Sequence, residues 1–91
     1  MKFNIEVGEL KKHRIEYDFN QLSGRLVIKL DQQEVKRNVR RFNEPLKETH
    51  WVRVEAPERV VVRIEKERRQ LLGCKCIVFV NDRLFRCYNG V

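Results

Sequence analysis

Residues 74–88, CKCIVFVNDRLFRCY, are the part of the sequence that points most directly to a fold. Cys74 to Val80 is hydrophobic, and residues 77–80 are apolar at every position, as expected for a strand at the centre of a sheet. Asn81-Asp82 tolerates the positive φ angles of a two-residue hairpin turn, and Leu84 to Tyr88 returns as a second strand. The stretch therefore predicts an antiparallel β-hairpin.

Alternation of apolar and polar residues continues along the rest of the chain. Successive side chains of a strand point to opposite faces, so alternation over several residues predicts a half-buried strand. Residues with turn propensity separate these strands, among them the segments 20–24 and 31–33. Further strands are predicted at about residues 3–7, 13–18, 25–30, 50–54 and 60–65.

The segment 34–42 is ambiguous. Val35, Val39 and Phe42 have the i, i+4, i+7 spacing of a helix face. In a strand, half of one face would be cationic, which suits an edge strand protected by charge. The strand interpretation is favoured because the surrounding segments are all β.

About eight short strands without a βαβ rhythm predict an all-β fold. We expect an antiparallel β-sandwich with meander-like hairpins and little or no helix. The 91 residues have room for one domain, so the whole chain, 1–91, is predicted to be a single β-sandwich domain. A two-domain enzyme is excluded by this length.

The charge balance is strongly basic. Lys and Arg number 20 against 13 Asp and Glu, which gives a formal net charge of +7. The N-terminus lacks the apolar core of a signal peptide, and no apolar run approaches the ~20 residues of a membrane span. We therefore expect a cytoplasmic protein with reduced thiols and no membrane partner.

Several fragments of the sequence occur in the order and spacing of a known domain. In residue type they resemble the N-terminal domain of the Fas apoptotic inhibitory molecule family, over roughly residues 12 to 88. The fragments include HRIEY at 13–17, SGR at 23–25, KET at 47–49, VRI at 62–64 and VFVN at 78–81.

The resemblance implies an all-β sandwich of about eight antiparallel strands. In animals, the family consists of non-enzymatic proteins that moderate death-receptor signalling, support neurite outgrowth and have been linked to protection against protein aggregation. Its members carry two similar β domains, whereas this chain spans one. The resemblance thus implies a non-catalytic, adaptor or regulatory domain that binds proteins.

The three cysteines are the only hint of a metal or redox site. If Asn81-Asp82 is a two-residue turn, Cys76 lies directly opposite Cys87, and Cys74 shares their face. Three thiols could bind a soft metal with a histidine as the fourth ligand, although C-x-C is not the usual zinc spacing. Buried structural thiols are the favoured interpretation, and a metal or redox role or a strained disulfide remains open.

Catalytic motifs are missing from the sequence. It has no Gly-x-Ser-x-Gly elbow and no Gly-rich phosphate loop. His13 lies on the apolar face of its strand, and we expect it to be a core or rim histidine satisfied by a hydrogen bond; His50 is similar. No enzymatic activity and no cofactor are therefore predicted.

Two cationic clusters raise the alternative that the domain binds RNA or single-stranded DNA. Small β domains bind single strands with a cationic groove and exposed aromatic residues. Glutamates interrupt both clusters, so a solvated charged face is favoured. The clusters are Lys36, Arg37, Arg40 and Arg41, and Lys66, Arg68 and Arg69.

Apolar runs at 60–62 and 77–80 raise an edge-paired homodimer as an alternative to a monomer.

Overall fold

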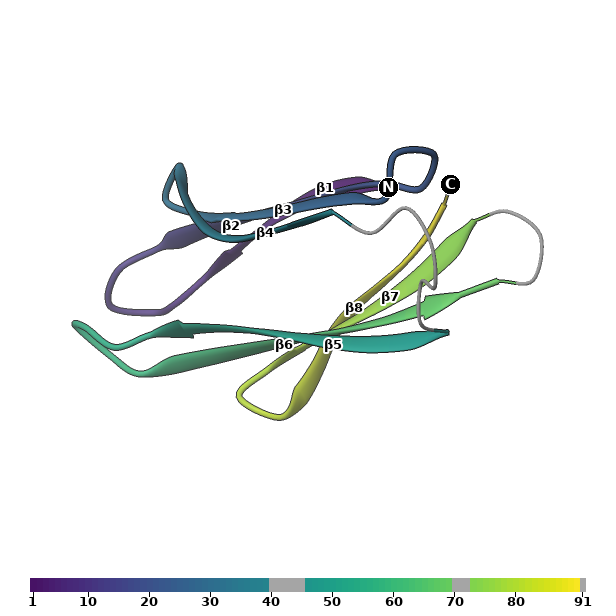
Figure 1. The fold of residues 1–91 in the computed structure, drawn as a ribbon. Coiled ribbons are helices and arrows are strands. Elements are labelled where there is room, and N and C mark those ends of the chain that lie inside the picture. The colour runs from purple at the N-terminus through teal and green to yellow at the C-terminus, as the bar shows by residue number, and fades with distance from the viewer. Residues whose placement is uncertain (40–45, 70–72, 91) are drawn as a thin grey trace. The chain divides into compact units, whose positions relative to one another are not determined.

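Eight antiparallel strands make up the chain in the computed structural model, which describes residues 1–39, 46–69 and 73–90 (Figure 1). They form two four-stranded sheets in which each strand pairs with its neighbours in sequence. The all-β antiparallel class and the meander-like hairpins are thus confirmed, and the described residues contain no helix. The first sheet holds β1 (Lys2–Val7), β2 (His13–Asn20), β3 (Arg25–Leu30) and β4 (Gln33–Val39). The second holds β5 (Lys47–Val54), β6 (Val60–Arg68), β7 (Cys74–Val80) and β8 (Arg83–Gly90).

The two sheets of the predicted sandwich correspond to two units of the chain. Contacts cluster within residues 1–44 and within residues 45–90. Each unit therefore contains one complete meander. In the described ranges, no helical segment has the length and apolar character needed to cross a membrane.

The first sheet follows the predicted alternation closely. Asp31 and Gln32 have φ angles of 49° and 70°, as a two-residue hairpin turn requires, and Gly24 has a φ of 71° in the preceding turn. The ambiguous segment is a strand as far as Val39, as predicted, while residues 40–42 lie outside the described residues. The buried face of this sheet consists of Phe3, Ile5, Val7, His13, Ile15, Tyr17, Phe19, Leu26 and Ile28.

His13 is fixed at the rim of this buried face. Its Nδ1 lies 2.7 Å from Oδ2 of Asp31, and the backbone N–H of Arg14 donates to Oδ1 of Asp31 at 2.9 Å. The Arg14 hydrogen bond and then the His13 hydrogen bond lower the pKa of Asp31 below its ordinary value. The hydrogen bond predicted for His13 is therefore present.

The second sheet is built around the predicted β7–β8 hairpin. Asn81 and Asp82 have φ angles of 49° and 64°, and they form the expected turn. The Asn81 backbone N–H donates to the Val61 carbonyl at 2.8 Å, and its Oδ1 accepts the Val61 N–H at 2.9 Å. The turn is thus tied to β6 as well as to its own strands. The buried face includes Val52, Val54, Val60, Val62, Ile64, Cys74, Cys76 and Val78.

A β-bulge in β8 corrects the predicted register of this hairpin. Phe79 lies opposite Leu84, but Val78 lies opposite Arg86, so Phe85 is an extra residue. One extra residue moves every later side chain of the strand to the other face. Cys87 consequently lies opposite Ile77, and the prediction that it faces Cys76 is wrong.

Candidate interaction face

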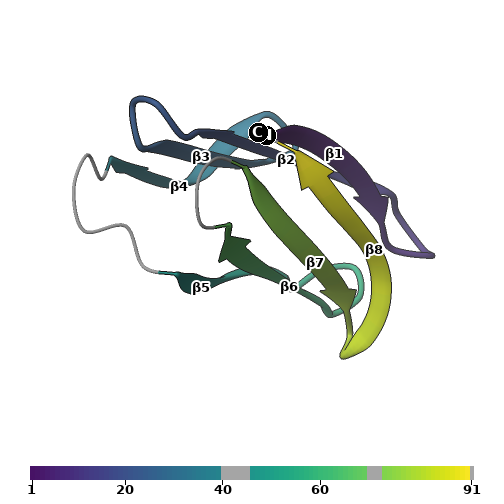
Figure 2. The ribbon, with the colours of Figure 1, turned by 90° about the vertical axis from the view of Figure 1, so that its right-hand side faces the viewer.

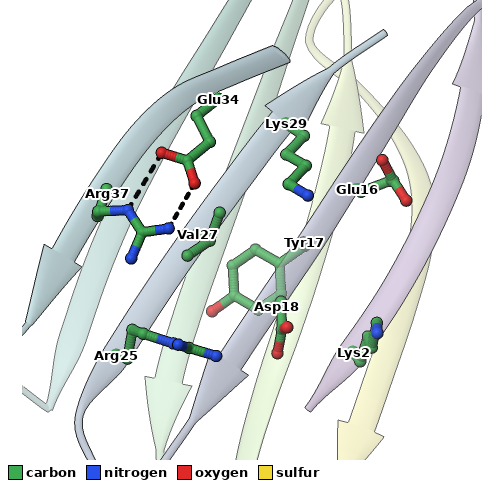
Figure 3. Close-up of a pocket in the computed structure, with 9 residues that line it drawn as sticks. All are labelled: Lys2, Glu16, Tyr17, Asp18, Arg25, Val27, Lys29, Glu34 and Arg37. Carbon is green, nitrogen blue, oxygen red and sulfur yellow. Dashed lines mark hydrogen bonds and ion pairs between the residues drawn. The ribbon is translucent and has the colours of Figure 1, made fainter. Parts of the chain in front are cut away.

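The exposed face of the first sheet carries side chains of opposite charge at directly paired positions. Across the four strands, Lys2 pairs in register with Asp18, and Glu16 pairs with Lys29. These side chains line a shallow pocket of about 170 Å³ (Figure 3). Because opposite charges occupy directly paired positions, this face resembles an ordinary solvated surface.

The first predicted cationic cluster lies on β4, at the edge of the first sheet. Arg37 donates through Nε to Glu34 at 3.1 Å, and this contact lowers the pKa of Glu34 and raises that of Arg37 (Figure 3). Lys36 is half-buried, and Arg40 and Arg41 lie outside the described residues. In the part of this cluster that the structure describes, the positive charge of Arg37 is therefore paired with the carboxylate of Glu34.

The second predicted cluster is not a surface patch. Lys66 is only 4% exposed and shares the buried face of β6 with Ile64, and Arg68 is half-buried in the same strand. Arg69 is exposed and donates through Nη2 to Oδ1 of Asn89 at 2.6 Å. The structure thus corrects the expectation that these three residues form one exposed cationic surface.

The three thiols do not gather on one face. Cys74 and Cys76 are buried, whereas Cys87 is exposed. His50 is buried, with its Nε2 at 3.8 Å from Oε1 of Glu48. Within residues 1–39, 46–69 and 73–90, no three His, Cys, Asp or Glu side chains form a group that could hold a metal ion.

The exposed face of the second sheet differs from that of the first because apolar side chains cross it. A row of directly paired residues runs over all four strands, from Trp51 through Arg63 and Phe79 to Leu84. Trp51 is 47% exposed and Leu84 is 68% exposed. We call this surface the Trp51 face; it consists of Thr49, Trp51, Arg53, Val61, Arg63, Glu65, Ile77, Phe79, Leu84 and Cys87.

Arg63 lies at the centre of this row, between the two aromatic rings. Its Cζ is 5.8 Å from the ring centroid of Trp51 and 4.2 Å from that of Phe79, both within cation–π range. The guanidinium also contacts Oε2 of Glu65 and Oδ1 of Asp82, each at 3.0 Å. These contacts hold the rings and the guanidinium in a fixed arrangement.

Arg53 extends the row at its β5 end. Its Cζ lies 5.7 Å from the Trp51 ring centroid, and no carboxylate of the described chain is within 4.0 Å of it. Trp51 therefore lies between Arg63, which is paired with carboxylates, and Arg53, which has no carboxylate near it among the described residues. Such a surface offers stacking, apolar contact and charge–charge attraction to a ligand.

Sequence reasoning placed Trp51 in a strand but missed the face around it. Alternation in β5 is a local signal, and it puts Trp51 on the face opposite Val52. The pairing with Arg63 and Phe79 depends on the register between strands, which no local pattern displays.

No family model, curated protein or solved structure matches the chain.

Proposed function

We propose that this chain is a non-catalytic β domain that binds another protein through the Trp51 face. The observation that carries the proposal is the row of Trp51, Arg63, Phe79 and Leu84 across the outer face of the second sheet, in which Trp51 and Leu84 are exposed and Arg63 and Phe79 are half-buried. Contiguous exposed apolar residues commonly mark interaction surfaces, and Trp and Arg are enriched among the residues that dominate binding energy. Among the described residues, the corresponding face of the first sheet carries paired charges with Val27 and Val39 between them and has no aromatic side chain.

The resemblance to the Fas apoptotic inhibitory molecule family supports the same proposal. That family is non-enzymatic, and a domain like it would act as an adaptor or regulator in the cytoplasm. The exposed thiol of Cys87 on the Trp51 face suits a reducing compartment, where it would not oxidise.

Single-stranded nucleic acid is the second candidate ligand. Bases stack on exposed aromatic residues in cationic surroundings, and Trp51 has arginine Cζ atoms at 5.7 Å and 5.8 Å. Binding of an oligonucleotide would weaken steeply between about 50 and 200 mM salt. If oligothymidylate and oligouridylate do not bind even at low salt, this candidate is excluded.

The proposal can be tested with a photo-crosslinking side chain. Benzoylphenylalanine at position 84 should capture a protein from lysate of the source organism, and the product should be lost when Trp51→Ala is added. Asn4→Ala, at an exposed strand position of the first sheet, is the matched control and should leave the product unchanged. The same group at position 22, where Leu22 is 92% exposed on the first unit, should not capture that protein.

Capture that is equal at positions 84 and 22, or that survives Trp51→Ala, would contradict the proposed function. Circular dichroism of each variant shows whether the strands are retained.

A further inference from the structure

β8 is the edge of the second sheet and is exposed on both of its faces. It pairs only with β7 among the described strands, and Figure 2 shows it at the end of the order β5-β6-β7-β8. Every residue of β8 is exposed except Tyr88, which is half-buried, whereas β7 alternates between buried and half-buried positions over Cys74–Phe79. The strand therefore has surface available beyond the hydrogen bonds that it makes to β7.

The two faces of β8 differ in chemistry. Leu84 belongs to the Trp51 face and lies opposite Phe79. Arg83 and Arg86 lie opposite Val80 and Val78, on the side of the sheet where Val78 is buried, but both arginines are themselves exposed at the edge. No carboxylate of the described residues is within 4.0 Å of either arginine. The edge thus combines an apolar side with an uncompensated cationic side.

The outer edge of β8 also carries main-chain donors and acceptors. Edge strands present a row of N–H and C=O groups that can pair with an added extended segment. A second copy of β8, paired antiparallel about Arg86, would place Arg86 of one copy directly opposite Arg86 of the other. Like charges at neighbouring cross-strand positions are destabilising, so this edge disfavours its own copy and favours an acidic strand.

We propose that the protein partner contributes an extended segment in which carboxylates alternate with apolar side chains, and that this segment adds to the outer edge of β8. This inference rests on the proposed function. The carboxylates lie beside Arg83 and Arg86, and the apolar side chains continue the row that ends at Leu84. Main-chain hydrogen bonds supply affinity, and the two faces supply specificity.

The first test uses a synthetic decapeptide with blocked ends in which glutamate alternates with valine. Titration into ¹⁵N-labelled protein should shift the amide signals of β8 more than those of β5, the other edge of the sheet. Alternate amides of β8 should become protected from hydrogen exchange, because an added strand pairs with only every second residue. N-methylation of one alternating set of peptide nitrogens should abolish binding, and methylation of the other set should not.

The second test reverses the charge of the edge. Arg83→Glu with Arg86→Glu should weaken decapeptide binding about tenfold or more and should favour the peptide in which lysine replaces glutamate. Lys11→Glu with Lys12→Glu makes the same change in net charge at exposed positions outside the strands and is the matched control. It should change affinity less than about twofold at physiological salt, where distant charges are screened.

The inference is overturned if the decapeptide does not bind, if a scrambled peptide of the same composition binds equally well, or if the amides of β8 gain no protection. Binding of oligothymidylate at β8 in place of the peptide would also overturn it. Failure here is separable from failure of the proposed function. If capture from position 84 depends on Trp51 but survives the double arginine reversal, the Trp51 face binds a protein and the edge does not.

Discussion

The Asn81 turn allows a quantitative test of how the second sheet is held together. In Asn81→Ala, Val61 loses the side-chain acceptor of its N–H, and alanine must adopt the left-handed φ of 49°. Loss of the hydrogen bond costs about 1 kcal/mol, and the left-handed conformation costs a non-glycine residue about 1 kcal/mol more. We expect Asn81→Ala to lower the free energy of unfolding by about 2 kcal/mol. Asn81→Gly removes only the acceptor and should cost about 1 kcal/mol.

Urea denaturation followed by fluorescence of Trp51 measures this effect, because Trp51 is the only tryptophan and lies in the second sheet. With a slope near 1 kcal/mol/M, Asn81→Ala should lower the urea midpoint by about 2 M and Asn81→Gly by about 1 M. Asn81→Asp keeps an acceptor and tolerates the turn, so it should stay within about 0.5 kcal/mol of the natural protein. Asn4→Ala, an exposed strand position in the first sheet, controls for loss of an asparagine side chain. Equal midpoints for the alanine and glycine variants would refute the backbone contribution, and no change in either would refute the turn's role.

Three further predictions concern acid stability, thiol reactivity and the core. Because the pKa of Asp31 is lowered in the folded state, its contribution is present above the ordinary value of 3.8 and is lost as pH falls through the folded pKa. Thermal unfolding between about pH 6 and pH 2 should therefore show a smaller acid-induced decrease in the melting temperature for Asp31→Asn, and an unchanged decrease would contradict this. Cys87 should react with an aromatic disulfide reagent in the native protein, whereas Cys74 and Cys76 should react only on unfolding; three equally fast thiols would disprove the burial. Ile64→Ala removes a fully buried side chain and should cost about 2 to 4 kcal/mol in urea denaturation, so a loss below about 1 kcal/mol would show that the site is not packed.

The parts of the fold that depend on local chemistry could be predicted from the sequence. The Asp31-Gln32 and Asn81-Asp82 turns need residues that tolerate positive φ, and the residue types at these positions display that tolerance directly. Alternation of apolar residues then locates the strands between the turns, because it reports which face of each strand is buried.

The parts that depend on pairing between strands could not be predicted in this way. The bulge at Phe85 has no local signature, and it reversed the face of Cys87. Lys66 begins a polar run that suggests a flexible loop, yet β6 continues to Arg68 because Lys66 pairs with Cys76 and Arg68 with Cys74. The Trp51 face has the same origin, since only the register brings Arg63 between Trp51 and Phe79.

The position of Arg63 bears on the solubility of the free domain. An unbroken stripe of large apolar side chains on a sheet invites aggregation, and a charge within the stripe opposes it. The guanidinium separates Trp51 from Phe79 in the row and is itself paired with Glu65 and Asp82. The domain can therefore expose aromatic surface while keeping a charged group at the middle of that surface.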